Sequence, residues 1–379
     1  MLEDIIQERV RKLENYKSAN NPYPASVKRD FFIKKIVEDF SDFLKENREF
    51  YAVGRVRALR DQGKIIFGDL VDESGKIQFI LNKEVLQDFD LLQKTLDVGD
   101  FLECFGSAFL TKKEEKSLLI KSARIISKSL RPFPSNFYGL EDEEKRLRQR
   151  YLDLLMNEET KGIFVKKEIF WNTIRDFLKT EKYMEVETPI LEPIPGGAEA
   201  EPFITHHKAL DTDFYLKKLL VGGFERVFEI GRIFRNEGID REHLQDYTQM
   251  ECYAAYMDYE ELMKLTEKMY KTVIQKTCGS LETVYEEKKI NWEKEWPKLE
   301  YYDLFKKYAD IDLSKTSVKD LQKKADELDI NPPAGGEKNI GFGRLVDLIY
   351  KKTVRPNLVE PCFLVNPPIA IEPLAKRLE

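Results

Sequence analysis

The sequence predicts an α+β protein with two structured parts, and three observations lead to this prediction. From Tyr51 onward, apolar residues alternate with a period of two, which is typical of β-strands. After Arg131, helical periods alternate with short strand-like segments. The length of 379 residues exceeds that of a usual single domain and is sufficient for two.

The first half of the chain predicts a barrel. Charged helical patterns over residues 3–18 and 26–47 indicate an N-terminal helical extension, residues 1–48. Strands are then predicted over 51–60, 64–71, 76–81, 101–110 and 117–126, with a helix over 84–96. Three strands, a helix and two strands is the order of an OB-fold, a β-barrel that often binds single-stranded nucleic acid. We therefore assign residues 49–131 to such a barrel.

The second half reads as a separate domain, residues 142–379, behind a Pro-rich linker over 132–141. Helices are predicted over 142–155, 160–180 and 259–277, and strands over 185–188, 227–233 and 249–257. A polar helical insertion is expected over about 279–340, with a loop at 331–336. The helix over 160–180 carries a stripe that we assign to the core: Ile163, Phe164, Phe170, Trp171, Ile174 and Phe177.

Composition excludes several classes of protein. The chain is 42% hydrophobic and 34% charged, without an apolar run near the 18 or so residues that a membrane span needs. The N-terminal residues lack the order of a signal peptide, so we expect a cytoplasmic protein. Four scattered cysteines and three histidines give no zinc-ligand spacing. A net charge of −6 argues against a general polyanion binder, and the basic residues at 55–64 alone favour a solvated strand surface.

Phosphate-binding glycine motifs are absent, so nucleotide binding would need side chains instead. One polar segment provides them: Phe234-Arg235-Asn236-Glu237-Gly238-Ile239-Asp240, followed by Tyr247-Thr248-Gln249-Met250-Glu251. The arginine can neutralise a phosphate, the aromatic ring can stack on a base, and the glutamate can receive an ammonium. The segment resembles motif 2 of the class II aminoacyl-tRNA synthetases, and residues 231–259 match that motif throughout.

The resemblance implies a fold and a reaction. The fold is the class II antiparallel sheet flanked by helices. In the reaction, the amino acid's carboxylate attacks the α-phosphate of ATP, while the protein aligns the reactants and stabilises charge. Arg235 would be the catalytic residue, contacting both the α-phosphate and the carboxylate. Glu237 would lie near adenine, His243 would reach the terminal phosphates, and Tyr247 would stack on adenine, where the family usually has phenylalanine. The implied cofactors are ATP and Mg²⁺.

The chain is most similar to the lysine-specific members of this family, through the string Pro193-Ile194-Pro195-Gly196-Gly197-Ala198. There the resemblance implies that backbone near Gly197 meets the α-amino group of L-lysine. Glu251 and Tyr253 lie two apart on a strand and so face one side. At the base of a pocket, they would hold the ε-ammonium group. The alternative for Glu251 is a buried glutamate paired with a nearby arginine.

Two further segments resemble the family. Tyr183-Met184-Glu185-Val186-Glu187-Thr188-Pro189 is similar to motif 1, which implies a homodimer. In the barrel, Arg60, Phe67 and Gln78 match positions that meet the central uridine of the anticodon of tRNA(Lys), where the phenylalanine stacks and the glutamine reads a base edge. Taken alone, Phe67 would be assigned to the core and Gln78 to the surface.

The chain departs from the family in two places. A segment that carries a glutamate for the lysine α-amino group is missing between Leu216 and Lys217. The sequence ends at Glu379, where the family continues through motif 3 with its Mg²⁺-binding carboxylates. We therefore expect a C-terminally incomplete sheet, no metal ligand within these residues, and weak adenylation by them alone.

The leading hypothesis is ATP-dependent activation of lysine and its transfer to tRNA(Lys). The alternative is a non-catalytic tRNA-binding module derived from such an enzyme, which the two departures favour and the intact motif 2 disfavours. An aspartate- or asparagine-specific ligase is disfavoured by Glu251, because an acidic substrate would need a cation there. A protein-lysylating relative is disfavoured because such enzymes lack the anticodon barrel.

Overall fold

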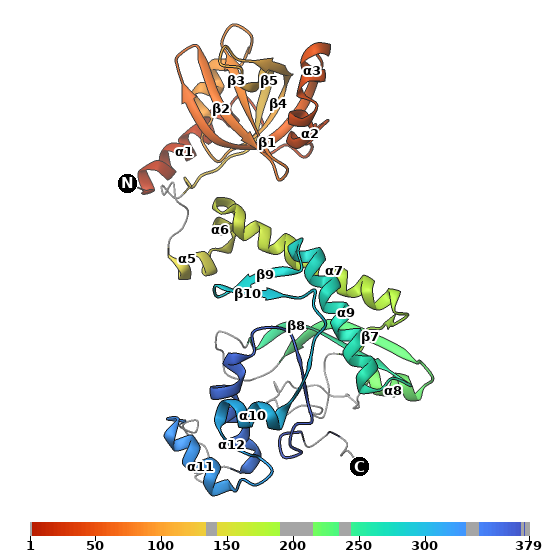
Figure 1. Cartoon of the computed structure of the whole chain (residues 1–379). Coiled ribbons are helices and arrows are strands. Elements are labelled where there is room, and N and C mark those ends of the chain that lie inside the picture. The colour runs from red at the N-terminus through yellow and green to blue at the C-terminus, as the bar shows by residue number, and fades with distance from the viewer. Residues whose placement is uncertain are drawn as a thin grey trace, which may run out of the picture. The chain divides into compact units, whose positions relative to one another are not determined.

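The computed structural model describes residues 2–133, 142–189, 215–234, 244–330, 341–372 and 375. The chain divides into two compact units, Met1–Asn157 and Glu158–Glu379 (Figure 1). Unit 1 contains a closed β-barrel with a helical extension. Unit 2 contains a small mixed sheet, two long helices and a separate helical cluster.

The barrel in unit 1 has the strand order β1-β2-β3-β5-β4. The strands are β1 (Glu49–Asp61), β2 (Ile65–Val71), β3 (Lys76–Asn82), β4 (Phe101–Leu110) and β5 (Lys116–Ser127), with α4 (Phe89–Thr95) between β3 and β4. Only the β3–β5 pairing is parallel. The predicted OB-fold order is therefore confirmed. The period-two pattern arises because alternate residues of a strand face the barrel interior. In β2, the buried residues are Ile66, Gly68 and Leu70.

Gly68 shows how tightly the barrel interior is filled. A Cβ atom at this position would lie 2.3 Å from Cζ of Phe79, whose side chain is fully buried. The Phe79 ring therefore occupies the space that any larger residue would need.

The N-terminal extension differs from the prediction. Helix α1 (Leu2–Lys17) is present, but residues 26–32 are not helical, and two short helices follow, α2 (Ile33–Glu38) and α3 (Phe40–Glu46). The backbone before α2 is held by the barrel instead, since Lys28 N–H donates to Glu103 and Asp30 N–H donates to the Tyr51 carbonyl. These partners replace the bonds that a helix would supply.

A buried ion network joins α1, the segment after α4, and the end of the β4–β5 pair at which β4 begins and β5 ends. The fully buried Lys128 Nζ lies 2.5 Å from Asp97 and 2.7 Å from Asp100. Lys12 of α1 lies 2.7 Å from Asp97. Burial opposes ionisation of both carboxyl groups. It raises the pKa of Asp100, whereas hydrogen bonds from Lys12 and Lys128 prevail at Asp97 and lower its pKa.

The polar region after the barrel forms two short helices, α5 (Glu143–Arg148) and α6 (Arg150–Met156), which meet at Gln149. Asp153 holds them together by accepting hydrogen bonds from Arg146 and Arg150. Burial disfavours the charged form of Asp153, but bonds from Asn157 and the two arginines outweigh it and lower its pKa to about 2.

Unit 2 is organised around a sheet of order β6-β7-β8. Strand β6 (Met184–Glu185) runs parallel to β7 (Arg226–Phe234), which pairs antiparallel with β8 (Asp246–Ala254). Helices α7 (Glu158–Thr180) and α9 (Tyr259–Cys278) pack on one face through a shared core. The short helix α8 (Tyr215–Val221) contacts β7 and β8. It runs through Leu216 and Lys217, the point at which the family segment is missing from the sequence.

Only half of the apolar stripe on α7 lies in the core. Ile174 and Phe177 are buried and Trp171 packs against them. In contrast, Ile163, Phe164 and Phe170 are 64%, 48% and 37% exposed. The assignment of these three residues to the core is therefore wrong, because the β-sheet covers only the second half of the helix.

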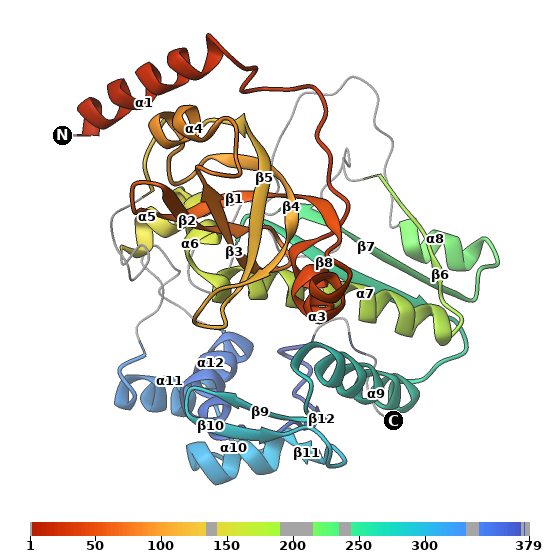
Figure 2. The same cartoon turned by 90° about the horizontal axis from the view of Figure 1, so that it is seen from above.

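Residues 279–300 contain strands instead of the predicted helices: β9 (Glu282–Tyr285), β10 (Lys288–Asn291) and β11 (Lys298–Glu300). Glu286 and Glu287 both have positive φ, as a two-residue hairpin turn requires. Beyond them, α10 (Tyr301–Ala309), α11 (Val318–Glu327) and α12 (Phe342–Ile349) gather into a core of their own, while β12 (Phe363–Val365) pairs with β11 (Figure 2). The loop predicted at 331–336 lies outside the described residues.

The buried ion network gives a stability prediction. Replacing Lys128→Met removes the cation between Asp97 and Asp100 and leaves Asp100 charged and enclosed. The free energy of unfolding should fall by about 3–5 kcal/mol. Urea unfolding followed by circular dichroism measures this change. The control Lys113→Met removes an exposed lysine from the β4–β5 turn and should unfold like the parent. Equal stability of both variants would show that the network does not support the barrel.

Candidate functional site

The open face of the β7–β8 hairpin carries a set of polar residues. The strands pair Glu229 with Glu251, Gly231 with Gln249, and Ile233 with Tyr247. Alternate residues such as Phe228 and Met250 point to the opposite face and pack toward α7 and α9. Because side chains alternate along a strand, the first set must share the face that these two helices leave open.

Three of these residues form a hydrogen-bonded row along β8. The Tyr247 hydroxyl donates to Gln249 Oε1 over 3.1 Å, and Gln249 Nε2 donates to Glu251 Oε1 over 2.5 Å. Glu251 is exposed and has this amide as a partner instead of an arginine. The interpretation of Glu251 as a buried glutamate paired with an arginine is therefore wrong for this structure. Its carboxylate is fixed in direction and remains open to a ligand.

A second carboxylate lies directly opposite. Glu229 is the cross-strand partner of Glu251, and like charges in that relation destabilise a sheet unless a cation joins them. Glu229 is oriented by Thr188, whose backbone N–H and hydroxyl donate to it over 2.7 and 2.6 Å. This contact also fastens the segment after β6 to the sheet.

Tyr253 completes the row at the α8 end of the sheet. Burial raises the pKa of its hydroxyl, and the charge of Glu251 adds to the effect. Its ring lies 5.9 Å from Lys217 Nζ of α8. Tyr253 is thus a neutral phenol two residues from Glu251, and both side chains are on the same face.

Four predicted site residues lie outside the described residues: Gly197, Arg235, Glu237 and His243. The last three belong to the connection between β7 and β8. The register of that hairpin ends at the pair Phe234–Asp246, so Tyr247 stands one residue inside the strand end.

The predicted barrel residues come together on the outer face. Arg60 of β1 pairs with Phe67 of β2. Phe67 is half-buried and alternates with the inward-facing Ile66 and Gly68, so its assignment to the core is wrong. Gln78 is only 5% exposed, which also contradicts its assignment to the surface. Ser117 Oγ donates to Gln78 Oε1 over 2.9 Å, which fixes the side-chain amide on the β3–β5 pair.

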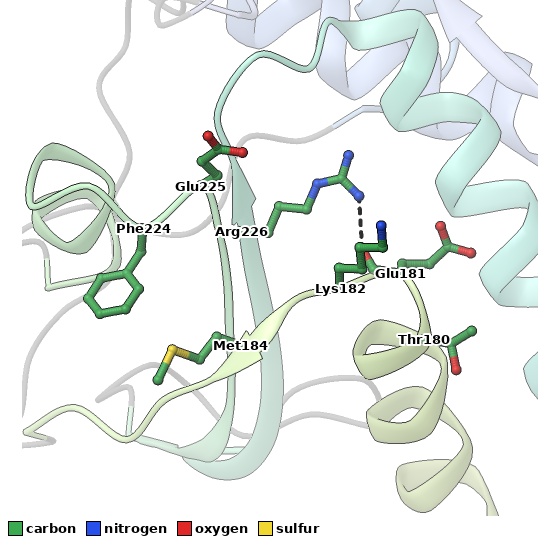
Figure 3. Close-up of a pocket in the computed structure, with 7 residues that line it drawn as sticks. All are labelled: Thr180, Glu181, Lys182, Met184, Phe224, Glu225 and Arg226. Atoms are coloured by element: carbon green, nitrogen blue, oxygen red, sulfur yellow. Dashed lines mark hydrogen bonds between the residues drawn. The ribbon is translucent and has the colours of Figure 1, made fainter.

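A hollow of about 540 Å³ lies at the start of β7 (Figure 3). Its lining residues are Thr180, Glu181, Lys182, Met184, Phe224, Glu225 and Arg226. Arg226 Nη1 donates to the Glu181 carbonyl over 2.8 Å, as the figure shows. None of the predicted site residues lines this hollow, so we do not assign the site to it.

Metal-binding clusters are not found in the part of the chain that the structure describes, where no group of three or more His, Cys, Asp or Glu residues could hold an ion. All four cysteines are free thiols. Among the described helices, none has the length and apolar character needed to cross a bilayer.

Comparison with known proteins defines the family. Residues 142–379 match the family model of class II tRNA synthetases (D, K and N), and residues 51–126 match that of the OB-fold nucleic acid binding domain. The chain therefore belongs to the class II tRNA synthetases of the D, K and N group. It is similar to lysine–tRNA ligases of known sequence.

These relatives align along almost the whole chain. The lysine–tRNA ligase of Dehalococcoides mccartyi is 39% identical, with 98% of this chain and 76% of that protein aligned. Those of Carboxydothermus hydrogenoformans and Roseiflexus castenholzii are 37% and 38% identical over 99% of this chain, and 78% and 79% of their own lengths are covered.

Sequence reasoning missed Glu229, Thr188, Gln249 and Ser117. Glu229 stands between two apolar residues, and only the strand register reveals that it faces Glu251. Ser117 is far from Gln78 in sequence, and their contact depends on the parallel β3–β5 pairing. Gln249 could have been found from the sequence, because residues two apart on a strand share a face and Gln249 is two residues from Glu251.

The Ser117–Gln78 bond gives a direct test of the barrel face. Ser117→Ala should leave the buried Gln78 Oε1 without its donor and lower the free energy of unfolding by about 1–3 kcal/mol. Thermal unfolding of the purified chain measures this. Ser122→Ala, an exposed serine on the same strand, is the control and should have no effect. If the two variants unfold together, Ser117 does not hold Gln78.

Proposed function

We propose that this protein is a lysine–tRNA ligase, which activates L-lysine with ATP as lysyl-adenylate and transfers it to tRNA(Lys). The observation that carries the proposal is the pair of carboxylates on the open face of the β7–β8 hairpin, with Tyr253 beside them. The aligned relatives, which are lysine–tRNA ligases, support it.

In the lysine site, Glu251 receives the ε-ammonium group and Tyr253 closes one side. Glu229 adds a second negative charge opposite Glu251, so the substrate cation relieves a repulsion that exists without it. The same pair disfavours aspartate, which would bring a third carboxylate to the sheet. Gly197 meets the α-amino group through its backbone, as in the family that the sequence resembles.

In the ATP site, Arg235 holds the α-phosphate and the lysine carboxylate together, which places the nucleophile in line with the phosphorus. It also stabilises the negative charge that develops there. Glu237 lies near adenine and His243 near the terminal phosphates. Tyr247 stacks on adenine, and its bond to Gln249 supports this because it fixes the ring beside the lysine row.

Mg²⁺ would enter with the phosphates of ATP, since this ion is usually held by phosphates and few carboxylates. When bound, it would neutralise phosphate charge. The described residues do not form a cluster that fits it, and we assign it no ligand in this part of the chain.

For tRNA(Lys), Phe67 stacks on the central anticodon uridine, Gln78 reads its edge, and Arg60 lies beside the ring. The partly exposed Phe67 side chain on the outer barrel face supports this, because stacking platforms for unpaired bases need an accessible aromatic face. We place the protein in the cytoplasm, which agrees with its free cysteines.

We also propose a homodimer through motif 1 and α7. The first half of α7 exposes Ile163, Phe164, Val165, Ile169 and Phe170. An apolar surface of this kind is uncommon on a monomer and typical of an interface.

Lysine recognition can be tested at Glu251. Glu251→Gln keeps the shape and removes the charge, so lysine affinity should fall about 10- to 100-fold, the range for a charged hydrogen bond. Isothermal titration of L-lysine measures this, and the uncharged analogue norleucine should bind both proteins alike. Glu282→Gln on β9 serves as an exposed control. Unchanged lysine affinity in Glu251→Gln would rule out the assigned site.

The dimer can be tested on α7. Ile163→Asp combined with Phe164→Asp should convert a dimer into a monomer, because charge would be buried across the interface. Sedimentation equilibrium measures the mass. Val284→Asp in β9 alters a residue that is 68% exposed and should leave the dimer intact. A parent protein that sediments as a monomer would contradict this interface.

A further inference from the structure

Two arginines contact the same aromatic ring where the chain leaves the barrel, and a third donates to the backbone just before that ring. Arg55 and Arg57 lie on β1, and Arg9 lies on α1. The Arg57 guanidinium carbon is 5.0 Å from the centroid of the Phe133 ring, and that of Arg55 is 5.8 Å from the same ring. Arg9 Nη1 donates to the Ser129 carbonyl over 2.8 Å, close to Phe133 in sequence.

The strand itself directs these side chains outward. Val56 is fully buried in the barrel, so its neighbours Arg55 and Arg57 face away from the core. The register with β2 shifts between Val56 and Ala58, which makes Arg57 the extra residue of a β-bulge. Bulges commonly redirect a side chain next to a functional site.

The three guanidinium groups retain unused hydrogen-bond donors. Arg9 Nε, Arg55 Nε and Arg57 Nη1 are buried without a hydrogen-bond partner. Arg9 is more than nine-tenths buried, at 8% exposure. Within the described residues, none of the three forms an ion pair with a carboxylate. Burial lowers the pKa of Arg55, and the neighbouring charge of Arg57 lowers it further.

Aromatic stacking alone does not explain this arrangement. A ring covers the flat face of a guanidinium, but the N–H donors lie in its plane and point outward. Phe101, 4.3 Å from Arg55, and Phe133 therefore leave those donors unsatisfied. Buried charges and polar groups are normally paired, so two like charges held side by side, without a carboxylate partner among the described residues, favour an anion at the accessible edge of the two guanidinium groups.

We propose that Arg55 and Arg57, backed by Arg9, bind a phosphate of the RNA backbone on the outer wall of the barrel. Planar guanidinium groups match phosphate oxygens, and both side chains are partly exposed. The outer face of β1 continues from Arg57 to Arg60, the cross-strand partner of Phe67. The RNA strand follows β1 from this phosphate site to the base platform.

This inference rests on the proposed function, because it takes the ligand to be tRNA. It assigns a role to basic residues that sequence reasoning favoured as solvated surface. It concerns phosphate contacts alone, which set affinity and salt dependence without reading the base sequence.

The test measures binding of a tRNA(Lys) transcript by fluorescence anisotropy at several salt concentrations. The variant Arg55→Gln with Arg57→Gln should bind roughly tenfold more weakly, and the slope of log affinity against log salt should fall by about 0.7–0.9 for each phosphate that the variant no longer neutralises. The control Arg11→Gln with Lys17→Gln removes the same charge from exposed positions on α1 and should keep the slope. The variant Arg55→Lys with Arg57→Lys retains both charges, so its slope should be close to that of the parent protein.

If the folded Arg55→Gln, Arg57→Gln variant binds tRNA with the parental affinity and salt slope, the inference is overturned. The proposed function still stands in that case, because the parent protein binds tRNA. A parent that does not bind tRNA overturns both. A second arm follows thermal unfolding in inorganic phosphate. Stabilisation of the parent but not of the Gln variant, with an unchanged tRNA slope, would show a site for free phosphate and overturn the RNA assignment.

Discussion

The register between β7 and β8 is the constraint on which the proposed active site depends. Phe228, Ile230, Met250 and Cys252 must face the core that α7 and α9 provide, so the residues between them must face the other way. A slip of one residue would bury Glu229, Glu251 and Tyr253 and expose the core. Packing of the hydrophobic core therefore determines which residues lie on the open face of the sheet, and the strand register alone places the two carboxylates opposite each other.

In the barrel, too, the packing of the core determines which side chains face outward. Inward-facing residues such as Ile66 and Leu70 close the core, and the alternate positions carry Arg60 and Phe67 on the outer wall. Lys128, buried between Asp97 and Asp100, joins the segment after α4 to the ends of β4 and β5, and Lys12 links α1 to Asp97. The guanidinium groups beside Phe133 differ from that network, because no carboxylate among the residues that the structure describes pairs with them. This contrast distinguishes a structural ion network from a surface prepared for an anionic ligand.

Local pattern was enough to predict the barrel strands and their order, since period-two alternation follows directly from a buried inner face. It was also enough for α9, whose start is marked by the capping box of Asp258 and Glu261 and whose end is marked by Gly279. It was insufficient where the partner is distant in sequence. Residues 26–32 are not helical because barrel groups bind their backbone, and half of the α7 stripe is exposed because the sheet ends before it. The roles of Gly197, Arg235, Glu237 and His243 remain sequence-based proposals.

The most direct test of the proposed activity is ATP–pyrophosphate exchange by the purified, folded chain, with lysine and aspartate run side by side. The paired carboxylates of β7 and β8 predict exchange that requires lysine and does not respond to aspartate. Exchange driven by aspartate, or no lysine-dependent exchange from a folded chain, would contradict the proposal that this protein activates lysine.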